Sequence, residues 1–257
     1  MMLVDLSNKI GVIPARLHST RFPKKILADI NGKPMAIRTA EQVSKVKNLD
    51  RIIIAIDSDE TYQALKDFDY ELMMTSEKHE SGTDRVAEVI EYIQSAEEFM
   101  QLLEVGVECA KTGDADIVIN IQADEPFIDP ELIDRLIEVH CDPTIEMSTL
   151  VSTRITVEDY DNESVVKAFL DESNFATDFK RRAVARYKHL GIYGFTKKSL
   201  LDFVSLEQTV NEKSRNLEQM RALDNGIKIK AVLTDKDSLS INTLDDLLHI
   251  SKKGGTL

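Results

Sequence analysis

The sequence has only two cysteines, Cys109 and Cys141, among its 257 residues. Two isolated cysteines are too few for a disulfide framework or a cysteine-based zinc site, so we expect a cytoplasmic protein in a reducing compartment. The N-terminal residues Met1 to Asp5 lack the basic region and the long apolar stretch of a signal peptide. No apolar run approaches the roughly 20 residues of a membrane-spanning helix, so no membrane partner is expected.

An excess of positive charge is also missing. The chain carries 32 Lys and Arg against 45 Asp and Glu, a formal net charge of −13. This balance argues against a general nucleic-acid-binding protein and against docking on anionic lipid. A small anionic substrate is not excluded, because it needs only a local cationic pocket. Two common phosphate-binding motifs are absent, namely G-x-x-x-x-G-K-[ST] and a G-x-G-x-x-G after the first predicted strand.

A cluster of cations runs against this acidic trend. Residues 10–13 form a short apolar run that is typical of a strand buried on both faces, and we expect Pro14 to end its ladder because proline has no N–H. The cations in the loop that follows are Arg16, Arg21, Lys24 and Lys25. Open α/β sheets bind ligands at the carboxyl ends of their strands, and these charges suit a polyphosphate. A solvated surface loop is the alternative, but the clustering favours a binding loop.

Strand-like and helix-like segments alternate through most of the chain, which predicts βα units and a mainly parallel sheet. The predicted strands cover residues 10–13, 51–57, 71–75, 116–122, 147–155, 165–170, 189–195 and 228–233. The predicted helices cover residues 34–46, 59–68, 86–111 (with a break at 94–97), 130–140, 198–204, 213–225 and 243–251. Segment 175–187 has no clear assignment. We therefore predict one α/β domain over 1–257, a Rossmann-like sheet flanked by helices, with a smaller lobe at roughly 147–200.

An acidic pair follows a later strand. The predicted strand 116–122 leads directly into Asp124 and Glu125, and its carboxyl end should lie at the same edge of the sheet as the basic loop. Cations can hold phosphates, and a carboxylate can hold Mg²⁺, which prefers oxygen ligands and shares the phosphates. Asp124 and Glu125 alone are more often a capped turn. Together with the basic loop, they favour a Mg²⁺-dependent nucleotide transferase over a structural protein.

Five segments in the same order carry a more specific resemblance. They lie in residues 13–35 (I-P-A-R, S-T-R-F-P and I-N-G-K-P-M), 81–85 (S-G-T-D-R), 120–126 (N-I-Q-A-D-E-P), 189–194 (H-L-G-I-Y-G) and 217–221 (L-E-Q-M-R). With them the chain resembles the 3-deoxy-manno-octulosonate (Kdo) cytidylyltransferases, or CMP-Kdo synthetases, over nearly its whole length. The resemblance implies a fold of the nucleotide-diphospho-sugar transferase type, whose smaller lobe serves dimerisation and sugar binding.

The resemblance also implies an activity. The anomeric hydroxyl of an acidic eight-carbon sugar attacks the α-phosphate of CTP, giving the CMP-sugar and pyrophosphate. The enzyme would be a Mg²⁺-dependent nucleotidyltransferase, typically a homodimer, serving lipopolysaccharide or other surface-polysaccharide biosynthesis. Its partners would be CTP and the acidic sugar, with no nucleic acid.

The same resemblance assigns roles to individual residues. The implied catalytic residues are Arg16, Arg21, Lys25 and Asp124. The implied nucleotide-binding residues are Pro14, Ala15, Arg16, Lys25, Ser81, Gly82, Arg85 and Gln122. The implied sugar-binding residues are Gln122, Arg181, His189, Tyr193, Glu218 and Gln219. The implied metal ligands are Asp124 and Asn242.

The chain departs from the family pattern at the predicted metal site. Asn242 stands where the family has an aspartate that is the second magnesium ligand, so the site loses one negative charge. Mg²⁺ should bind more weakly, unless Asp235 or Asp237 compensates. Lys24 and Ala123 replace family glycines and are expected to add bulk close to the nucleotide.

The acceptor side departs as well, because the segment after Arg181 is shorter than in the family. Two alternatives therefore stay open beside a Kdo cytidylyltransferase. One is a cytidylyltransferase for a different acidic acceptor, such as a phosphonate or a nonulosonic acid. The other is a non-catalytic nucleotide-binding subunit, with Asn242 marking the loss of the second metal ligand.

Overall fold

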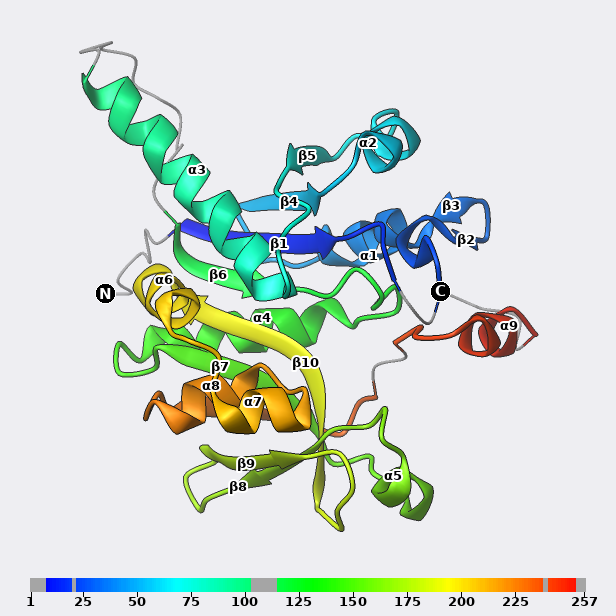
Figure 1. The fold of residues 1–257 in the computed structure, drawn as a ribbon, viewed down its shortest axis with the longest axis vertical. Coiled ribbons are helices and arrows are strands. Elements are labelled where there is room, and N and C mark those ends of the chain that lie inside the picture. Colours follow the sequence, from blue (N-terminus) through cyan, green and yellow to red (C-terminus); the bar gives the residue numbers. More distant parts are fainter. Residues whose placement is uncertain (1–7, 20–21, 103–114, 238–239, 253–257) are drawn as a thin grey trace.

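Nine strands form one mixed sheet in the computed structural model, which describes residues 8–19, 22–102, 115–237 and 240–252 (Figure 1). The strand order is β11-β7-β10-β6-β1-β4-β5, and β8 and β9 extend the sheet from β10. The strands of this sheet are β1 (Asn8–Ala15), β4 (Arg51–Ile56), β5 (Glu71–Met74), β6 (Ala115–Asn120), β7 (Met147–Ser152), β8 (Lys167–Leu170), β9 (Ala176–Lys180), β10 (Tyr187–Thr196) and β11 (Ile229–Thr234). A separate hairpin consists of β2 (Asp29–Ile30) and β3 (Lys33–Pro34).

Helices connect these strands. They are α1 (Met35–Val43), α2 (Asp59–Leu65), α3 (Gly82–Leu102), α4 (Pro130–Glu138), α5 (Val157–Asp161), α6 (Lys197–Ser205), α7 (Val210–Arg215), α8 (Gln219–Asp224) and α9 (Leu244–Lys252), with short 3₁₀ turns η1 (Lys25–Leu27) and η2 (Val139–Cys141). Among the described helices, none combines the length and the apolar character needed to cross a membrane.

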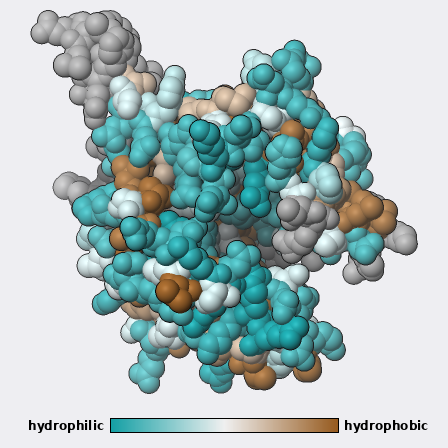
Figure 2. Space-filling view, in the orientation of Figure 1, coloured by the Kyte–Doolittle hydropathy of each residue, from teal (hydrophilic) through white to brown (hydrophobic). Residues whose placement is uncertain are grey.

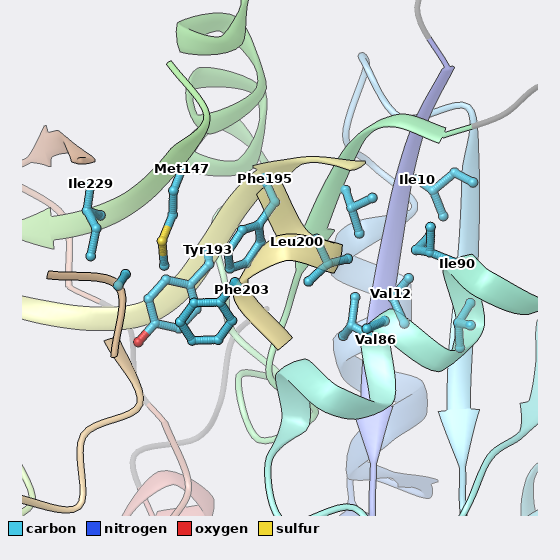
Figure 3. Close-up of a cluster of buried hydrophobic side chains, with 14 of the residues drawn as sticks. Ile10, Val12, Val86, Ile90, Met147, Tyr193, Phe195, Leu200, Phe203 and Ile229 are labelled. Carbon is cyan, nitrogen blue, oxygen red and sulfur yellow. The ribbon is translucent and has the colours of Figure 1, made fainter. Parts of the chain in front are cut away.

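Side chains alternate along the strands and so build a core on each face of the sheet. In β1, Ile10 and Val12 belong to one core, and Ile13 and Ala15 belong to the other. The first core is covered by α3 and α6, and Figure 3 shows Val86 and Ile90 of α3 directed toward β1. The second core is covered by α1 and α4. The fold is therefore a sheet between two layers of helices.

The four neighbouring strands β6, β1, β4 and β5 run parallel to one another. β1 pairs in parallel with β4 and with β6, β4 pairs in parallel with β5, and β11 pairs in parallel with β7. Among the described strands of this nine-stranded sheet, every antiparallel pair involves β10 or β8. The predicted α/β fold with a mainly parallel sheet is confirmed. As expected, the segments that follow β1 and β6 emerge at one edge of the sheet.

Pro14 does not end the first strand, contrary to our prediction. β1 continues to Ala15, and Pro14 is paired with Ala55 of β4. On the other side, the ladder with β6 stops at Val12, whose carbonyl accepts a hydrogen bond from the N–H of Ile121. Residues two apart in a strand direct their backbone groups to the same side, so the missing N–H of Pro14 affects only the β6 side.

Two helix predictions were also wrong. The helix predicted over 213–225 is two short helices, α7 and α8, because Asn216 has a φ of 51° and ends α7 in the left-handed conformation. The break predicted at 94–97 is absent, since α3 is continuous across it. Residues 103–111 of the predicted helix lie outside the described residues. The unassigned segment 175–187 contains β9.

Candidate active site

Two adjoining pockets lie beside the segments that follow β1 and β6. They share Pro14, Arg16 and Gln122, so they form one continuous site. The first pocket is also lined by Ser19, Lys25, Ile26, Ala123, Asp124 and Asn242. The second pocket is also lined by Glu80, Ser81, Gly82, Arg85, Arg181, Asn216 and Glu218. Figure 2 shows a hollow near the middle of the molecular face, bordered mainly by hydrophilic residues.

Positive and negative charge meet in the first pocket. Lys25 Nζ lies 2.5 Å from Asp124 Oδ2, and the two side chains are only 13% and 20% exposed. Arg16 lines the same pocket. The fold thus brings together two cations of the basic loop and a carboxylate that is 99 residues away from Lys25 in the sequence. A partly buried group of this kind can bind an anion and a cation side by side.

Backbone contacts fix the acidic loop after β6. Thr39 of α1 donates its hydroxyl to the carbonyl of Ala123 at 2.9 Å, and the N–H of Ile241 donates to the carbonyl of Asp124 at 2.9 Å. The second contact attaches the segment before α9 to this loop, and it places Asn242 in the same pocket as Asp124. Two segments far apart in the sequence therefore meet at the predicted metal ligands.

The oxygen atoms of the first pocket can supply part of a Mg²⁺ site. The described residues contain no group of three or more His, Cys, Asp or Glu side chains that could hold a metal ion. Asp124 supplies one carboxylate and Asn242 one neutral amide oxygen, and Mg²⁺ in nucleotide sites is commonly held by one or two carboxylates plus substrate phosphates. The suggested compensation by Asp235 or Asp237 has no structural support, because neither lines the described pockets and Asp237 pairs with Lys188 at 2.6 Å.

The start of α3 forms one wall of the second pocket. Ser81 and Asp84 exchange hydrogen bonds: the N–H of Asp84 donates to Ser81 Oγ at 3.1 Å, and the N–H of Ser81 donates to Asp84 Oδ2 at 3.2 Å. A Cβ atom on Gly82 would lie 3.3 Å from the ring of Pro14 and 3.7 Å from Gln122 Oε1. Glycine thus lets the backbone of α3 approach the end of β1 and leaves space in the pocket.

Arg85 is anchored from behind this wall. The side chain is only 2% exposed, and it donates to Thr75 Oγ1 and, at 3.1 Å, to Asp57 Oδ2. Burial lowers the pKa of Arg85, and the charge of Asp57 opposes that change. Asp57 also accepts the N–H of Leu17 at 2.9 Å, so it connects the basic loop to α3. Sequence analysis gave Asp57 no role, although it follows the second strand directly.

Arg181 lines the other side of the second pocket and is held by main-chain oxygens. It donates to the carbonyl groups of Glu163 at 2.8 Å, Arg215 at 3.1 Å and Asn216 at 2.8 Å. Its own carbonyl accepts a hydrogen bond from Lys167 Nζ, which is buried. The guanidinium is therefore fixed in place while it faces the pocket.

Glu218 precedes α8 and lines the pocket near Arg181. Its Oε1 atom accepts the hydroxyl of Thr83 at 2.9 Å. Burial raises the pKa of Glu218 to about 7, with the Thr83 hydrogen bond acting in the opposite direction. A carboxyl group with this pKa is partly ionised at neutral pH.

Three further residues with implied sugar roles form a layer behind Glu218. His189 is hydrogen-bonded to Thr149 Oγ1 at 2.8 Å, and burial lowers the pKa of His189 to about 3. Its ring lies 5.3 Å from that of Tyr193, and the hydroxyl of Tyr193 donates to Gln219 Oε1 at 3.1 Å. Among the buried side-chain atoms of the described residues, Gln219 Nε2 is a donor without a hydrogen-bond partner.

The structure brings most of the implied site residues together. Those that line the pockets are Pro14, Arg16, Lys25, Ser81, Gly82, Arg85, Gln122, Asp124, Arg181, Glu218 and Asn242. Those that do not line the described pockets are Ala15, His189, Tyr193 and Gln219. Arg21 lies outside the described residues. Pocket residues to which sequence analysis gave no role are Ser19, Ile26, Glu80 and Asn216, each next to or within a segment that did attract attention.

Lys24 differs from its neighbour Lys25. It has a φ of 55°, a left-handed conformation that favours glycine, and its side chain forms an ion pair with the exposed Glu60. Lys24 is not among the lining residues of the described pockets. The backbone conformation explains why a glycine suits this position, independently of any contact with a nucleotide.

The chain is similar to known cytidylyltransferases over most of its length. A family model described as "Cytidylyltransferase" matches residues 10–229. The 3-deoxy-manno-octulosonate cytidylyltransferase of Thermodesulfovibrio yellowstonii is 37% identical over 93% of this chain and 94% of its own length. That of Trichlorobacter lovleyi is also 37% identical, over 93% of this chain and 95% of its own length. A solved structure of CMP:2-keto-3-deoxy-manno-octonic acid synthetase complexed with CTP is similar with a TM-score of 0.83 and 30% identity, covering 96% of this chain and 98% of the other. The resemblance indicated by the five segments is confirmed.

Proposed function

This chain belongs to the cytidylyltransferase family, and we propose that it couples CTP to Kdo or to a closely related 2-keto-3-deoxy sugar acid, releasing pyrophosphate. The proposal depends above all on one observation: Arg16, Lys25 and Asp124 line a single pocket. This is the arrangement that a triphosphate with its cation needs. Surface-polysaccharide synthesis is the process that such a product would serve.

The reaction forms one bond and breaks one. The anomeric oxygen of the acceptor bonds to the α-phosphorus of CTP, and the bond from that phosphorus to the α–β bridging oxygen breaks. Pyrophosphate leaves with the bridging oxygen, and the proton of the hydroxyl group passes to solvent. Arg16 and Lys25 are the residues in position to stabilise the negative charge that develops on the leaving pyrophosphate.

Mg²⁺ is the proposed cofactor. Asp124 and Asn242 would hold it in the first pocket, together with phosphate oxygens of the nucleotide. When bound, the ion supplies positive charge that neutralises the phosphate oxygens. Lys25 Nζ contacts Asp124 Oδ2, and the second carboxylate oxygen would allow Asp124 to keep that contact and ligate an ion.

The second pocket is the proposed site for cytosine and the acceptor. Ser81, Gly82 and Arg85 would read the base from the start of α3. Arg181 would bind the sugar carboxylate, because a guanidinium offers paired donors with carboxylate geometry and this one is already oriented by three carbonyl groups. Glu218 would accept hydroxyl groups of the sugar.

The layer behind Glu218 does not line the described pockets, and we assign it a supporting role on the acceptor side. The unpaired amide donor of Gln219 supports a place for it next to a polar ligand, because a buried donor without a partner costs free energy. His189 and Tyr193 keep this layer in place through their contacts with Thr149 and Gln219.

The direct test is pyrophosphate release from CTP, with Kdo first and then with a panel that includes amino-substituted Kdo, phosphonates and nonulosonic acids. Turnover with Kdo or a close relative supports the proposal. Turnover only with a phosphonate or a nonulosonic acid would show that the acceptor is that acid and not Kdo. The variant Asn242→Asp, which restores a carboxylate, is assayed alongside. No turnover in either protein with any acceptor contradicts the proposal and favours a non-catalytic nucleotide-binding subunit.

A homodimer in the cytoplasm is the proposed state of the enzyme. The family resemblance supports the dimer, and the low cysteine content supports a reducing compartment. Light scattering of the purified protein, with a monomer mass of 29.0 kDa as reference, tests the assembly.

A further inference from the structure

A chain of hydrogen bonds runs behind the wall of the two pockets and connects one part of the site to another. Gln122 Nε2 donates to Asn120 Oδ1 at 3.2 Å, Asn120 Nδ2 donates to Thr83 Oγ1 at 3.0 Å, and Thr83 Oγ1 donates to Glu218 Oε1 at 2.9 Å. Gln122 and Glu218 line the pockets, whereas Asn120 and Thr83 are 0% and 1% exposed. The two middle residues therefore contact residues of the site but do not line the described pockets themselves.

The hydrogen bonds of this chain have a fixed direction. A threonine hydroxyl has one proton to donate, and Thr83 Oγ1 already accepts the amide N–H of Asn120. Its proton is therefore directed at Glu218. Asn120 is itself firmly held, since it belongs to β6 and is paired with Val12 of β1 on one side and with Tyr193 of β10 on the other.

We propose that Thr83, oriented by Asn120, is a positioning residue that directs the Glu218 carboxylate into the second pocket for binding of the acceptor. This inference rests on the proposed function, because it assumes that the second pocket receives an acidic sugar. Thr83 also lies in the first turn of α3, next to the Ser81 and Gly82 wall. The same turn thus forms the predicted cytosine site and holds a residue of the acceptor site.

The Thr83 hydroxyl also affects the charge of Glu218. A hydrogen bond to the carboxylate stabilises the ionised form, so its loss should raise the pKa of Glu218 further above the value of about 7. Other charged or titratable groups face Glu218 from the neighbouring elements and pocket walls: Asp84, Glu212, Arg221, Tyr193, Arg16, Arg85, Arg181 and Glu80. None of these changes when only the hydroxyl of residue 83 is removed.

The experiment compares Thr83→Val, which keeps the shape but loses the hydroxyl, with Thr83→Ser, which keeps the hydroxyl. Thr61→Val is a matched control, since Thr61 is a fully buried threonine in α2 that lies outside the pockets. We expect Thr83→Val to raise the KM for the acceptor about tenfold or more, as for loss of a hydrogen bond to a charged group, with the KM for CTP within about twofold. In the pH profile of kcat/KM for the acceptor, the acidic limb of Thr83→Val should lie at higher pH than that of the wild type. Thr83→Ser should restore the KM for the acceptor and the pH profile.

A second measurement does not require turnover. Carbon-13 NMR of glutamate carboxyl groups, with the Glu218 signal assigned by its loss in Glu218→Gln, gives the pKa of Glu218 directly. A higher pKa in Thr83→Val supports the inference, and an unchanged pKa overturns it. An equal rise of both KM values that Thr83→Ser does not restore overturns it as well. If the wild-type protein turns over no acceptor, the proposed function fails while the NMR result still tests the contact. If Thr83→Val does not fold, Thr83→Ala removes the same hydroxyl.

Discussion

The first pocket and the acceptor side of the second pocket are built in different ways. In the first, Lys25 and Asp124 follow β1 and β6 and contact each other directly. On the acceptor side, Arg181 is held by main-chain carbonyl groups and Glu218 by a buried threonine. A triphosphate and its cation would have to share or replace the contact between Lys25 and Asp124. The charged groups of the acceptor side are instead oriented by neutral partners before the sugar binds.

Removal of Asp124 should have the largest effect on activity. We expect Asp124→Ala to lower kcat by about a hundredfold to a thousandfold, because the first pocket then keeps its cations and loses its only lining carboxylate among the described residues. Asp237→Asn is the control, since Asp237 pairs with Lys188 outside the pockets. Steady-state pyrophosphate release compares the three proteins. Near wild-type activity in Asp124→Ala would contradict the metal assignment.

The two adjacent lysines provide a matched pair for the next test. Lys25→Ala should lower kcat/KM for CTP by about a hundredfold, because it removes a partly buried cation from the phosphate site. Lys24→Gly should leave activity unchanged and stabilise the protein by about 1 kcal/mol, because glycine tolerates the left-handed conformation. Kinetics and thermal unfolding measure the two effects. Equal loss of activity in both variants would mean that the loop is sensitive as a whole and that Lys25 has no special role.

Arg181 and Arg182 provide the corresponding pair on the acceptor side. Arg181→Gln should raise the KM for the acceptor about tenfold and leave the KM for CTP unchanged, because Arg181 lines the second pocket among the residues proposed for the acceptor and not at the start of α3, where cytosine is proposed to bind. Arg182→Gln removes an exposed arginine that pairs with Glu163 on the surface, and we expect no kinetic change. A rise in the KM for CTP in Arg181→Gln would show that the two sides are not separable in this way.

The smallest predicted effect concerns stability on the acceptor side. Because burial lowers the pKa of His189 to about 3, from an ordinary value of 6.5, the unfolded chain binds more protons than the folded protein between these values. The free energy of unfolding should fall as the pH falls through that window, by at most about 1.4 kcal/mol per pH unit. His189→Gln should remove this contribution. Urea unfolding at pH 7, 5 and 4 measures the slope, and identical slopes in both proteins would contradict a neutral buried histidine.

The two sides also differ in how well the sequence predicts them. The basic loop and Asp124 could be placed because each follows an apolar run that forms a strand, and parallel strands end at one edge. Arg181, Asn216 and Glu218 converge only through tertiary contacts. The carbonyl of Asn216 holds Arg181, and it is placed by a turn in which Asn216 has the left-handed conformation. The polar pattern of residues 213–225 predicts a continuous helix there and gives no sign of this turn.

Buried polar contacts are the other feature that the sequence does not predict. The Thr83–Glu218 bond joins residues 135 apart, and Asp57 joins the basic loop to α3 through two bonds of different kinds. The sequence around Thr83, Glu218 and Asp57 shows no periodicity or spacing that predicts these partners. Pro14 is similar, because its effect on the ladder depends on which neighbouring strand its backbone faces.

The most direct test of the central claim is a crystal structure of the protein with CTP and Mg²⁺. We predict that the triphosphate lies in the first pocket, with Arg16 and Lys25 within hydrogen-bond distance of its oxygens and Asp124 beside the cation. A triphosphate bound away from these three residues, or a cation with no contact to Asp124, would contradict the claim.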